Sequence, residues 1–267
     1  MRFSIMFEKL KNTNSLLVMP YLSLGLLTED TTIELVQFFV EHGAQAIEFG
    51  FPFSDAIADG PIIQHASKLA IQNGFSYEQG FSTISRIRAL YPNLPICLML
   101  YANHVYSYGI DNFYAKCKQS GIDAVLIPDI PNIEAMPFLK SAKSYDIQPV
   151  LFATPSCDNK DLEFSAKNSE GFVYLVTRTG VTGTKQAANF DQMSPIIQKL
   201  KSFQSAPIIC GFGIKQASDL HKAQQSNSQG VIIGSALIEP LLPTADHPKS
   251  CLNAAKNVFK EIVTNSG

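Results

Sequence analysis

Eight short apolar runs recur along this chain of 267 residues, and most are followed by a segment with helical spacing. Each run is rich in β-branched or aliphatic residues and is bounded by Gly, Pro, Asn or Asp, as buried parallel strands are. A unit of about 33 residues matches a strand–helix–strand repeat of roughly 30. The runs are 17–22, 46–49, 96–100, 124–128, 148–153, 172–177, 207–210 and 231–233. They predict an α/β fold, a (β/α)8 TIM barrel with extra terminal helices.

An open, doubly wound sheet is the alternative fold. A dinucleotide-binding sheet would carry GxGxxG after its first strand, and Leu22-Ser23-Leu24-Gly25 does not supply that pattern. No proline-rich linker or low-complexity stretch divides the chain, so we expect residues 1–267 to form a single domain. In a barrel, catalytic groups lie at the carboxyl ends of the strands, and phosphate often binds after strands 7 and 8.

The segments between the runs carry helix signals of their own. A capping box at residues 31–34 predicts the start of a helix that ends at Gly43. Residues 110–121 predict a second helix that ends in glycine, and residues 194–203 predict a third with Pro195 in its first turn. Residues 243–249 are expected to join two final helices.

Charge and cysteine content exclude several classes of protein. Lysine plus arginine is 21 and aspartate plus glutamate is 23, so no basic excess indicates nucleic acid or an anionic membrane as a partner. The longest apolar run, 16–27, is too short and too interrupted to span a bilayer, and the start of the chain does not resemble a secretory signal. Five cysteines without a CxxC pair fit reduced thiols, so we expect a cytoplasmic protein. The five histidines are widely separated and have no HxxxH or HxH spacing, so we expect no metal site.

One glutamate is placed where a barrel carries its chemistry. Alternation in the second run puts Ile47 and Phe49 on one face and Glu48 on the other, toward the barrel interior. Burial disfavours the charged form and raises the pKa of a carboxyl group, which can then transfer protons near neutral pH. The alternative is a buried glutamate paired with an arginine for structural reasons.

The loop at 51–61 adds two aspartates, Asp55 and Asp59. Asp59 stands next to Gly60, where it could reach over the barrel mouth and accept a proton. The alternative is that both aspartates cap helices or form turns. Tyr174, in the sixth run, is either a core aromatic residue or a hydrogen-bond partner for a carboxylate across the interior.

Three late glycine segments favour a phosphorylated ligand. They lie at 177–183, 211–213 and 234–236, after the last three runs, where glycine lets backbone N–H groups approach a phosphate. The chain has no GxxxxGK[ST] motif, so hydrolysis of a nucleoside triphosphate is not indicated. The residues alone thus predict a barrel enzyme with a small phosphorylated substrate and carboxylates for acid–base catalysis. A phosphosugar isomerase stays open as an alternative.

The motif IEFGFPFSD at 47–55, continued by ADGP at 58–61, closely resembles the tryptophan synthase alpha chain family. The resemblance continues, in the family's order and spacing, through LYAN at 100–103, DIP at 129–131, RTGVTG at 178–183, GFG at 211–213 and GSA at 234–236. It implies a barrel lyase that cleaves indole-3-glycerol phosphate to indole and glyceraldehyde 3-phosphate in tryptophan biosynthesis. It also implies an alpha2beta2 tetramer, in which indole passes to a beta chain that holds pyridoxal phosphate while this chain holds no cofactor.

The resemblance also implies roles for individual residues. Glu48 and Asp59 would be catalytic, supported by Tyr174 and Thr182. The phosphate would be held by Gly183, Gly213, Gly234 and Ser235, and the indole ring by Tyr21, Met99, Leu126, Phe152, Phe212 and Ile232. The beta chain would contact Pro52, Asp55, Asn103, Asp129 and Pro131. A non-catalytic barrel that only activates the beta chain is the alternative, and the presence of both carboxylates argues against it.

Overall fold

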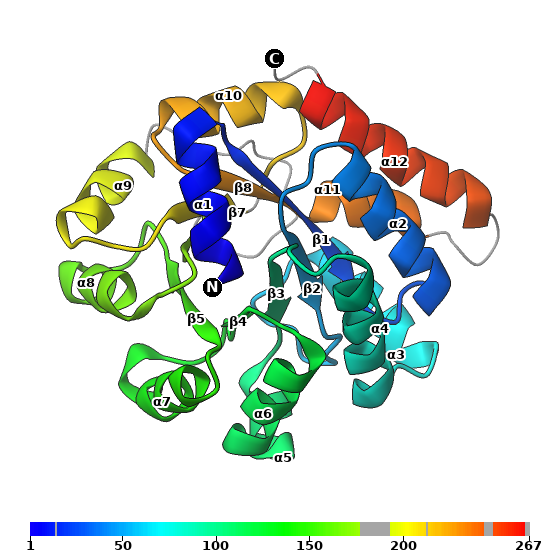
Figure 1. Cartoon of the computed structure of the whole chain (residues 1–267), viewed down its shortest axis with the longest axis horizontal. Helices are drawn as coiled ribbons and strands as arrows, with labels where there is room; N and C mark the ends of the chain where they lie inside the picture. Colours follow the sequence, from blue (N-terminus) through cyan, green and yellow to red (C-terminus); the bar gives the residue numbers. More distant parts are fainter. Residues whose placement is uncertain (14, 177–192, 212, 243–247, 265–267) are drawn as a thin grey trace.

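A computed structural model describes residues 1–13, 15–176, 193–211, 213–242 and 248–264 of the chain. Eight parallel strands form a closed barrel in sequence order, with helices around the outside (Figure 1). The strands are β1 (Leu17–Ser23), β2 (Ile47–Gly50), β3 (Ile96–Met99), β4 (Ala124–Leu126), β5 (Gln148–Ala153), β6 (Val173–Val176), β7 (Ile208–Gly211) and β8 (Gly230–Ile233). The predicted (β/α)8 barrel is confirmed.

The helices follow the strands around the barrel. They are α1 (Arg2–Thr13), α2 (Glu29–Glu41), α3 (Pro61–Gln72), α4 (Tyr77–Leu90), α5 (Ala102–Tyr108), α6 (Ile110–Ser120), α7 (Met136–Ser144), α8 (Asn159–Asn168), α9 (Met193–Ser202), α10 (Ala217–Gln225), α11 (Ser235–Ile238) and α12 (Pro248–Thr264). Two short 3-10 helices, η1 (Asn132–Glu134) and η3 (Glu239–Leu241), precede α7 and follow α11.

Each strand lies within two residues of its predicted run at both ends, over the part of the chain that the structure describes. The largest difference is at β4, which ends at Leu126 although the apolar run continues to Pro128. Pro128, at the end of that run, has no backbone N–H to donate to a neighbouring strand.

The predicted start of the helix after β1 is wrong. Helix α2 begins at Glu29, one turn before the expected capping box, because the Thr28 hydroxyl caps it by accepting from the Thr31 backbone N–H (3.3 Å). Glu29 and Asp30 in the first turn interact favourably with the helix dipole. The predicted end of α6 is confirmed, since Gly121 follows Ser120 at a φ of 78°, which favours glycine. Helix α9 begins one residue before its predicted start, and Pro195 lies in its first turn.

Strand register decides which side chains meet inside the barrel. Tyr21 of β1 lies beside Glu48 of β2, and Glu48 lies beside Cys97 of β3. Parallel pairing between β8 and β1, with Gly230 beside Leu17, closes the barrel. Residues at one register level on neighbouring strands point to the same side of a sheet, so Tyr21, Glu48 and Cys97 share one level of the interior.

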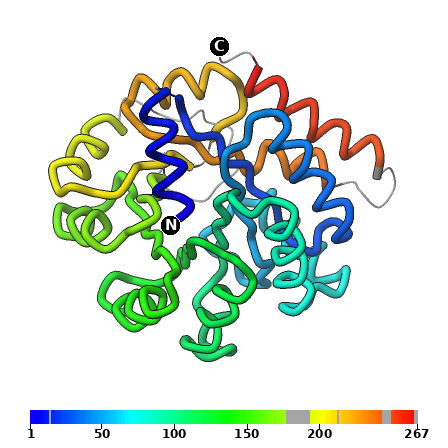
Figure 2. The backbone as a smooth tube through the Cα atoms, viewed as in Figure 1, coloured from blue at the N-terminus to red at the C-terminus, as the bar shows by residue number. Residues whose placement is uncertain are grey.

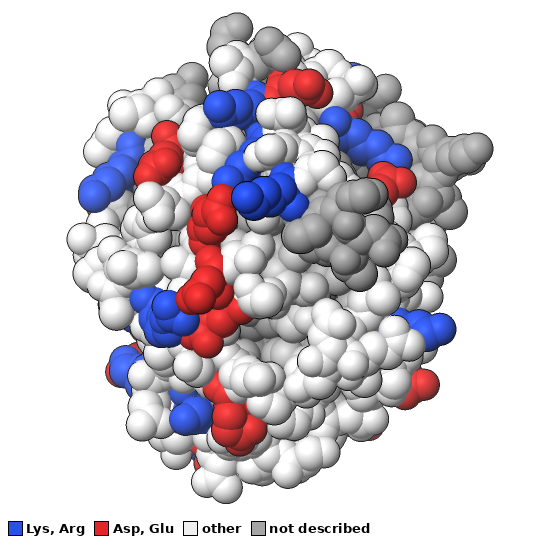
Figure 3. Space-filling model, turned by 90° about the vertical axis from the view of Figure 1, so that its right-hand side faces the viewer, with Lys and Arg blue, Asp and Glu red and all other residues white. Residues whose placement is uncertain are grey.

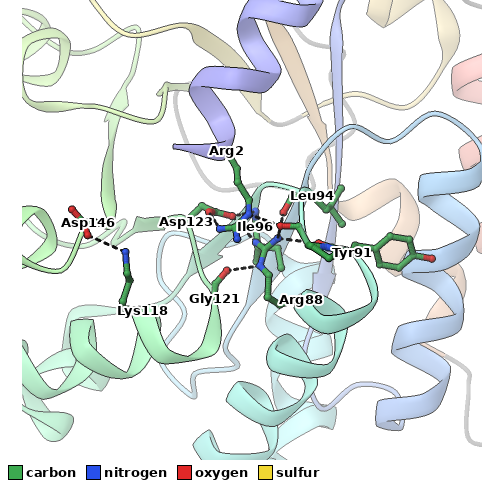
Figure 4. A network of polar contacts seen from close by, with 10 residues as sticks. Arg2, Arg88, Tyr91, Leu94, Ile96, Lys118, Gly121, Asp123 and Asp146 are labelled. Carbon is green, nitrogen blue, oxygen red and sulfur yellow. Dashed lines mark hydrogen bonds and ion pairs between the residues drawn. The ribbon is translucent and has the colours of Figure 1, made fainter.

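Helix α1 covers the amino end of the barrel, and Figure 4 shows the ion pairs that hold it there. Phe3 packs against Phe172 with ring centroids 5.4 Å apart. Arg2 pairs with the Asp123 carboxylate at 2.7 Å, and Arg88 of α4 pairs with the same carboxylate at 2.6 Å. Asp123 also accepts a hydrogen bond from the Ile96 backbone N–H (2.9 Å). This end of the barrel is closed, so a ligand has to enter from the other end.

The C-terminal helix α12 lies in the ring of helices between α10 and α2 (Figure 1), and Figure 2 shows its backbone beside that of α2. Phe259 of α12 packs on Phe39 of α2 with ring centroids 4.6 Å apart. Figure 3 shows side chains of both charge signs near one another on the face that includes these helices. Arg86 there pairs with Glu29 and Asp30, each at 3.0 Å. Within the described ranges, no helix is both long and apolar enough to cross a bilayer.

Candidate active site

A cavity opens at the carboxyl ends of the strands, the end of a barrel where catalytic groups lie. Most of its walls are apolar, and two carboxylates face into it. The lining residues are Tyr21, Glu48, Asp59, Ile63, Met99, Tyr174, Gly213, Ile214, Ile232, Gly234 and Ser235. They come from both halves of the barrel, so the closed fold is needed to assemble the cavity.

Glu48 is the more deeply buried of the two carboxylates. Its side chain is 1% exposed, and its Oε1 atom has no hydrogen-bond partner among the residues that the structure describes. Burial, and then the nearby negative charge of Asp59, raise the pKa of Glu48 to about 8, although a hydrogen bond from Cys97 opposes the rise. No arginine or lysine of the described chain pairs with Glu48, in contrast to the structural alternative. The group can therefore hold a proton at neutral pH and release it.

Asp59 reaches the cavity from the loop between β2 and α3 and is 5% exposed. Burial raises the pKa of its carboxyl group to about 6, while a hydrogen bond from Tyr101 lowers it. The Tyr101 hydroxyl donates to Asp59 Oδ2 at 2.8 Å and accepts from the Ala58 backbone N–H at 3.1 Å. At neutral pH, Asp59 is mostly ionised and Glu48 mostly protonated, which is the division of roles that acid–base catalysis needs.

The loop that carries Asp59 is held at several points. Gln64 of α3 donates to the backbone carbonyls of Ala56 (3.1 Å) and Asp59 (3.0 Å). Phe53 stacks on the Tyr101 ring with centroids 5.0 Å apart. These contacts pre-position the carboxylate before a ligand binds, which is the condition for efficient proton transfer.

Two tyrosines cross the barrel interior on either side of Glu48. A Cβ atom at Gly50 would lie 2.0 Å from the Tyr21 hydroxyl, and one at Gly211 would lie 2.3 Å from the Tyr174 hydroxyl. Glycine is required at both positions because any side chain would collide with a phenol. Burial and the charges of Glu48 and Asp59 raise the pKa of both tyrosines, so they remain neutral.

Glycine residues form the rim of the cavity after β7 and β8. Gly213 has a φ of 81°, in the left-handed region that favours glycine, and Gly234 is the residue before α11. Gly213, Gly234 and Ser235 all line the cavity. The structure thus brings together three of the four residues expected at a phosphate, and the fourth, Gly183, lies outside the described residues.

The residues expected around an indole ring divide into three groups. Tyr21, Met99 and Ile232 line the cavity. Leu126 is fully buried and Phe152 is half-buried, and neither lines it, although Phe152 packs edge-on against Tyr174 with centroids 4.9 Å apart. Phe212 lies outside the described residues, as does the supporting residue Thr182.

Four residues near the carboxylates were not expected there. Ile63 and Ile214 line the cavity, Tyr101 binds Asp59 and Cys97 binds Glu48. Tyr101 belongs to the LYAN motif, and the position of that motif directly after a strand could have indicated it. Cys97 carries no such signal, because its role depends on strand register.

The expected partner residues differ in exposure. Asp55, Asn103 and Pro131 are exposed at the carboxyl end of the barrel, Asp55 and Pro131 in loops and Asn103 in the first turn of α5, whereas Pro52 is buried. Asp129 is half-buried and accepts a hydrogen bond from the Ala102 backbone N–H (2.8 Å), which ties the loop after β4 to the start of α5. Within the described ranges, no three metal-binding side chains form a cluster that could hold an ion.

Comparisons with known proteins identify the family of this chain. Residues 7–265 match the family model described as tryptophan synthase alpha chain. The tryptophan synthase alpha chain of Shewanella oneidensis is 40% identical over 258 residues, which cover 97% of this chain and 92% of that protein. Its counterpart from Haemophilus influenzae (strain PittEE) is 38% identical over 251 residues, 94% of each chain.

Solved structures show the same architecture. A chain of the tryptophan synthase α2β2 complex from Pyrococcus furiosus superposes with a TM-score of 0.83 at 29% identity, covering 92% of this chain and 97% of that one. Tryptophan synthase subunit alpha from Legionella pneumophila superposes with a TM-score of 0.88 at 24% identity, over 99% and 98% of the two chains. The family match over nearly the full length, together with these relatives, shows that this chain belongs to the tryptophan synthase alpha chain family.

Proposed function

We propose that Glu48 and Asp59 are the acid–base pair with which this chain performs the lyase reaction of its family, the cleavage of indole-3-glycerol phosphate. The observation that carries the proposal is the pair of buried carboxylates at one cavity, with pKa values of about 8 and about 6. One group is protonated and the other ionised at neutral pH, and the reaction needs one of each.

The reaction begins when protonated Glu48 donates its proton to C3 of the indole ring. The ring nitrogen then carries positive charge, which ionised Asp59 stabilises by accepting the N–H hydrogen bond. Glu48, now a carboxylate, takes the proton of the hydroxyl group on the adjacent glycerol carbon. The C–C bond breaks, its electron pair returns to the indole ring, and the glycerol carbon becomes the aldehyde of glyceraldehyde 3-phosphate. Glu48 regains its proton, so no net oxidation or reduction occurs.

The rim glycines suit the phosphate group of this substrate. Gly213, Gly234 and Ser235 line the same cavity as the two carboxylates, and a backbone without side chains lets N–H groups approach an anion. Tyr21, Met99 and Ile232 provide apolar contact for the ring. We include Gly183, Thr182, Leu126, Phe152 and Phe212 in the proposal only by resemblance to the family.

The decisive experiment is indole release from indole-3-glycerol phosphate by Glu48→Gln. General acid–base groups contribute about 10²–10⁴-fold to rate, and Glu48 acts twice, so we expect a loss of at least ~10³-fold with the fold retained by circular dichroism. Glu163→Gln, which changes an exposed glutamate of α8, is the matched control and should keep full activity. Turnover near the wild-type rate in Glu48→Gln would refute the assignment.

We further propose that the loops after β2, β3 and β4 contact a beta chain that holds pyridoxal phosphate, while this chain holds no cofactor of its own. Large apolar side chains are exposed there: Ile57 (71%), Tyr106 (55%), Ile133 (89%) and Met136 (55%). Tyr106 and Phe138 touch edge-on with centroids 5.2 Å apart, which joins the helices after β3 and β4 into one surface. Apolar exposure on this scale is typical of a protein interface.

Calorimetric titration with the purified beta chain of the same organism tests this surface. Ile133→Asp should weaken binding at least tenfold, since it places a charge on a face that becomes dehydrated. Ile5→Asp, at an exposed isoleucine of α1 on the opposite end of the barrel, should leave binding unchanged. Equal effects of the two variants would place the interface elsewhere. Indole release by the chain alone separates an active lyase from a barrel that only activates its partner.

A further inference from the structure

Cys97 is a buried thiol directly beside the proposed catalytic acid. It is paired in register with Glu48 across β2 and β3, and its side chain is 0% exposed. The two side chains share one level of the barrel interior, where the thiol acts on the Glu48 carboxyl group as a hydrogen-bond donor that lowers its pKa. Among the residues that the structure describes, the Oε1 atom of Glu48 has no hydrogen-bond partner.

We propose that Cys97 is a positioning residue that donates its S–H to the ionised carboxylate of Glu48 and so stabilises the intermediate state in which Glu48 acts as a base. The inference rests on the proposed function, in which Glu48 alternates between acid and base. It adds a residue that acts through Glu48 and has no direct contact with the substrate.

The surroundings of Cys97 keep the thiol protonated. Burial, and then the negative charges of Glu48 and Asp123, raise the pKa of Cys97 well above its usual value. A thiol that keeps its proton can only donate to a carboxylate, although S–H is a weak donor. The hydrogen bond is therefore strongest when Glu48 is ionised, because a charged acceptor attracts the donor more than a neutral one does.

Three other titratable groups also face Glu48: Asp59, Tyr21 and Tyr174. None of them is a cause that lowers the pKa of Glu48. Asp59 comes from the loop after β2 and raises the pKa of Glu48 by its charge. Tyr21 of β1 and Tyr174 of β6 stay neutral and carry raised pKa values of their own. Cys97 is thus the group that lowers the pKa of Glu48 toward the working range of an enzyme.

The first test compares the pH dependence of kcat/KM for indole release in Cys97→Ala, Cys97→Ser and the wild type. Activity requires protonated Glu48, so it falls at high pH as this group ionises. Loss of the donor in Cys97→Ala should move this basic limb upward by roughly 0.5–1 pH unit, since a hydrogen bond to the charged form lowers a pKa. Cys97→Ser keeps a donor, and its basic limb should lie at or below that of the wild type.

Cys117→Ala is the matched control, because it removes a fully buried thiol from α6, away from the cavity. Its basic limb should coincide with that of the wild type. A purely structural role for Cys97 would lower activity at all pH values without moving the limb. An unmoved limb in Cys97→Ala, or equal shifts in the Ala and Ser variants, would overturn the proposal.

A second test needs no Cys97 variant and no turnover. The S–H stretching band in infrared difference spectra of the wild type should move to lower frequency as Glu48 ionises between pH 6 and pH 10. The same spectra of Glu48→Gln should lack this shift, while the contribution of half-buried Cys157 is common to both proteins and cancels. Identical difference spectra would overturn the thiol–carboxylate contact. Absence of indole release by the wild type would instead refute the proposed function, and the infrared band would still decide the contact.

Discussion

Asp123 and Glu48 are both buried carboxylates of the same barrel, yet only Asp123 is matched by positive charge. At the amino end, Asp123 has two arginine partners at 2.7 and 2.6 Å and a backbone N–H at 2.9 Å (Figure 4). At the carboxyl end, Glu48 faces a cavity with a weak thiol donor and a second carboxylate nearby.

The difference separates stability from chemistry. A buried ion becomes costly to disturb once partners surround it, whereas a buried carboxyl group without a cation stays protonated and can transfer that proton. The closed end, where α1 and α4 meet β4, therefore holds the barrel together. The open end keeps its carboxyl groups in a state that costs free energy and is available for catalysis.

The largest expected effect is on stability, at the closed end. Asp123→Ala leaves Arg2 and Arg88 without their shared partner, and breaking a buried pair costs about 3–5 kcal/mol of the free energy of unfolding. Urea unfolding measures this loss. The kcat of the protein that remains folded should stay near the wild-type value.

Lys118→Ala is the control for that experiment, since it removes an exposed ion pair with Asp146 that Figure 4 also shows. Exposed pairs contribute about 0–1 kcal/mol. A similar loss of unfolding free energy in both variants would mean that the buried Asp123 network stabilises the protein no more than an exposed ion pair does.

The second prediction concerns the stability cost at the open end. The pKa of Glu48 rises from 4.5 to about 8 on folding. Between these two pH values, Glu48 is protonated in the folded protein and ionised in the unfolded chain. The stability from this group is fully present below pH 4.5 and is lost as pH rises toward 8. Glu48→Gln removes that dependence. Its free energy of unfolding, minus that of the wild type, should therefore be about 2–4 kcal/mol larger at pH 8 than at pH 5.

Urea unfolding of both proteins at the two pH values provides the comparison. The contributions of titrating groups that do not interact with Glu48 are common to the two proteins and cancel in the difference, whereas Asp59 is coupled to Glu48 by charge and is part of the effect. Parallel curves for the wild type and Glu48→Gln would show that Glu48 titrates normally in the folded chain.

The third prediction is the shape of the pH–rate profile. The proposed mechanism needs Asp59 ionised and Glu48 protonated, so kcat/KM should be maximal between pH values of about 6 and about 8. Outside this window it should fall about tenfold per pH unit on each side. A profile that stays flat up to pH 10 would exclude Glu48 as the proton donor.

The smallest effect is expected from Tyr101→Phe. The phenyl ring keeps its stacking on Phe53, but Asp59 loses its hydrogen bond, so the pKa of Asp59 rises and the acid limb moves upward. We expect kcat/KM to fall about 3–5-fold at pH 6 and to change little at pH 8.

This variant also identifies the group behind the acid limb, since a substrate phosphate titrates near pH 6 as well. Tyr106→Phe, at an exposed tyrosine of α5, is the control and should leave both limbs in place. If Tyr101→Phe leaves the acid limb unmoved, the limb belongs to the substrate and not to Asp59.

Much of this architecture could be predicted from residues that are close in the sequence. Apolar runs and the glycines or prolines at their ends locate the strands, because buried parallel strands need both. Alternation within β2 predicts that Glu48 faces the interior, and the structure places it on the cavity. The start of α2 was misjudged because Thr28 and Thr31 are both acceptable caps, and their hydroxyls hydrogen-bond each other at 2.8 Å.

What could not be predicted depends on contacts between distant segments. The Tyr101 hydroxyl meets Asp59 because residues 42 positions apart in the chain come together at the open end of the barrel, and no local pattern encodes that contact. Cys97 meets Glu48 because of the register between two strands, and a shift by one residue would turn the thiol toward the helices. Pro52 is buried although its loop lies at the open end.

Closure of the barrel between β1 and β8 has a consequence for synthesis of the chain on the ribosome. One edge of β1 (Leu17–Ser23) pairs only with β8, which ends at Ile233, so about 210 residues must be added before that edge finds its partner. At about 5–20 residues per second, the wait is roughly 10–40 s. During that time an apolar strand with unpaired backbone groups is exposed to other nascent chains. The first strand to be made is thus the last to be protected, and its Pro20, which has no N–H to offer, reduces the pairing available to an intruding strand.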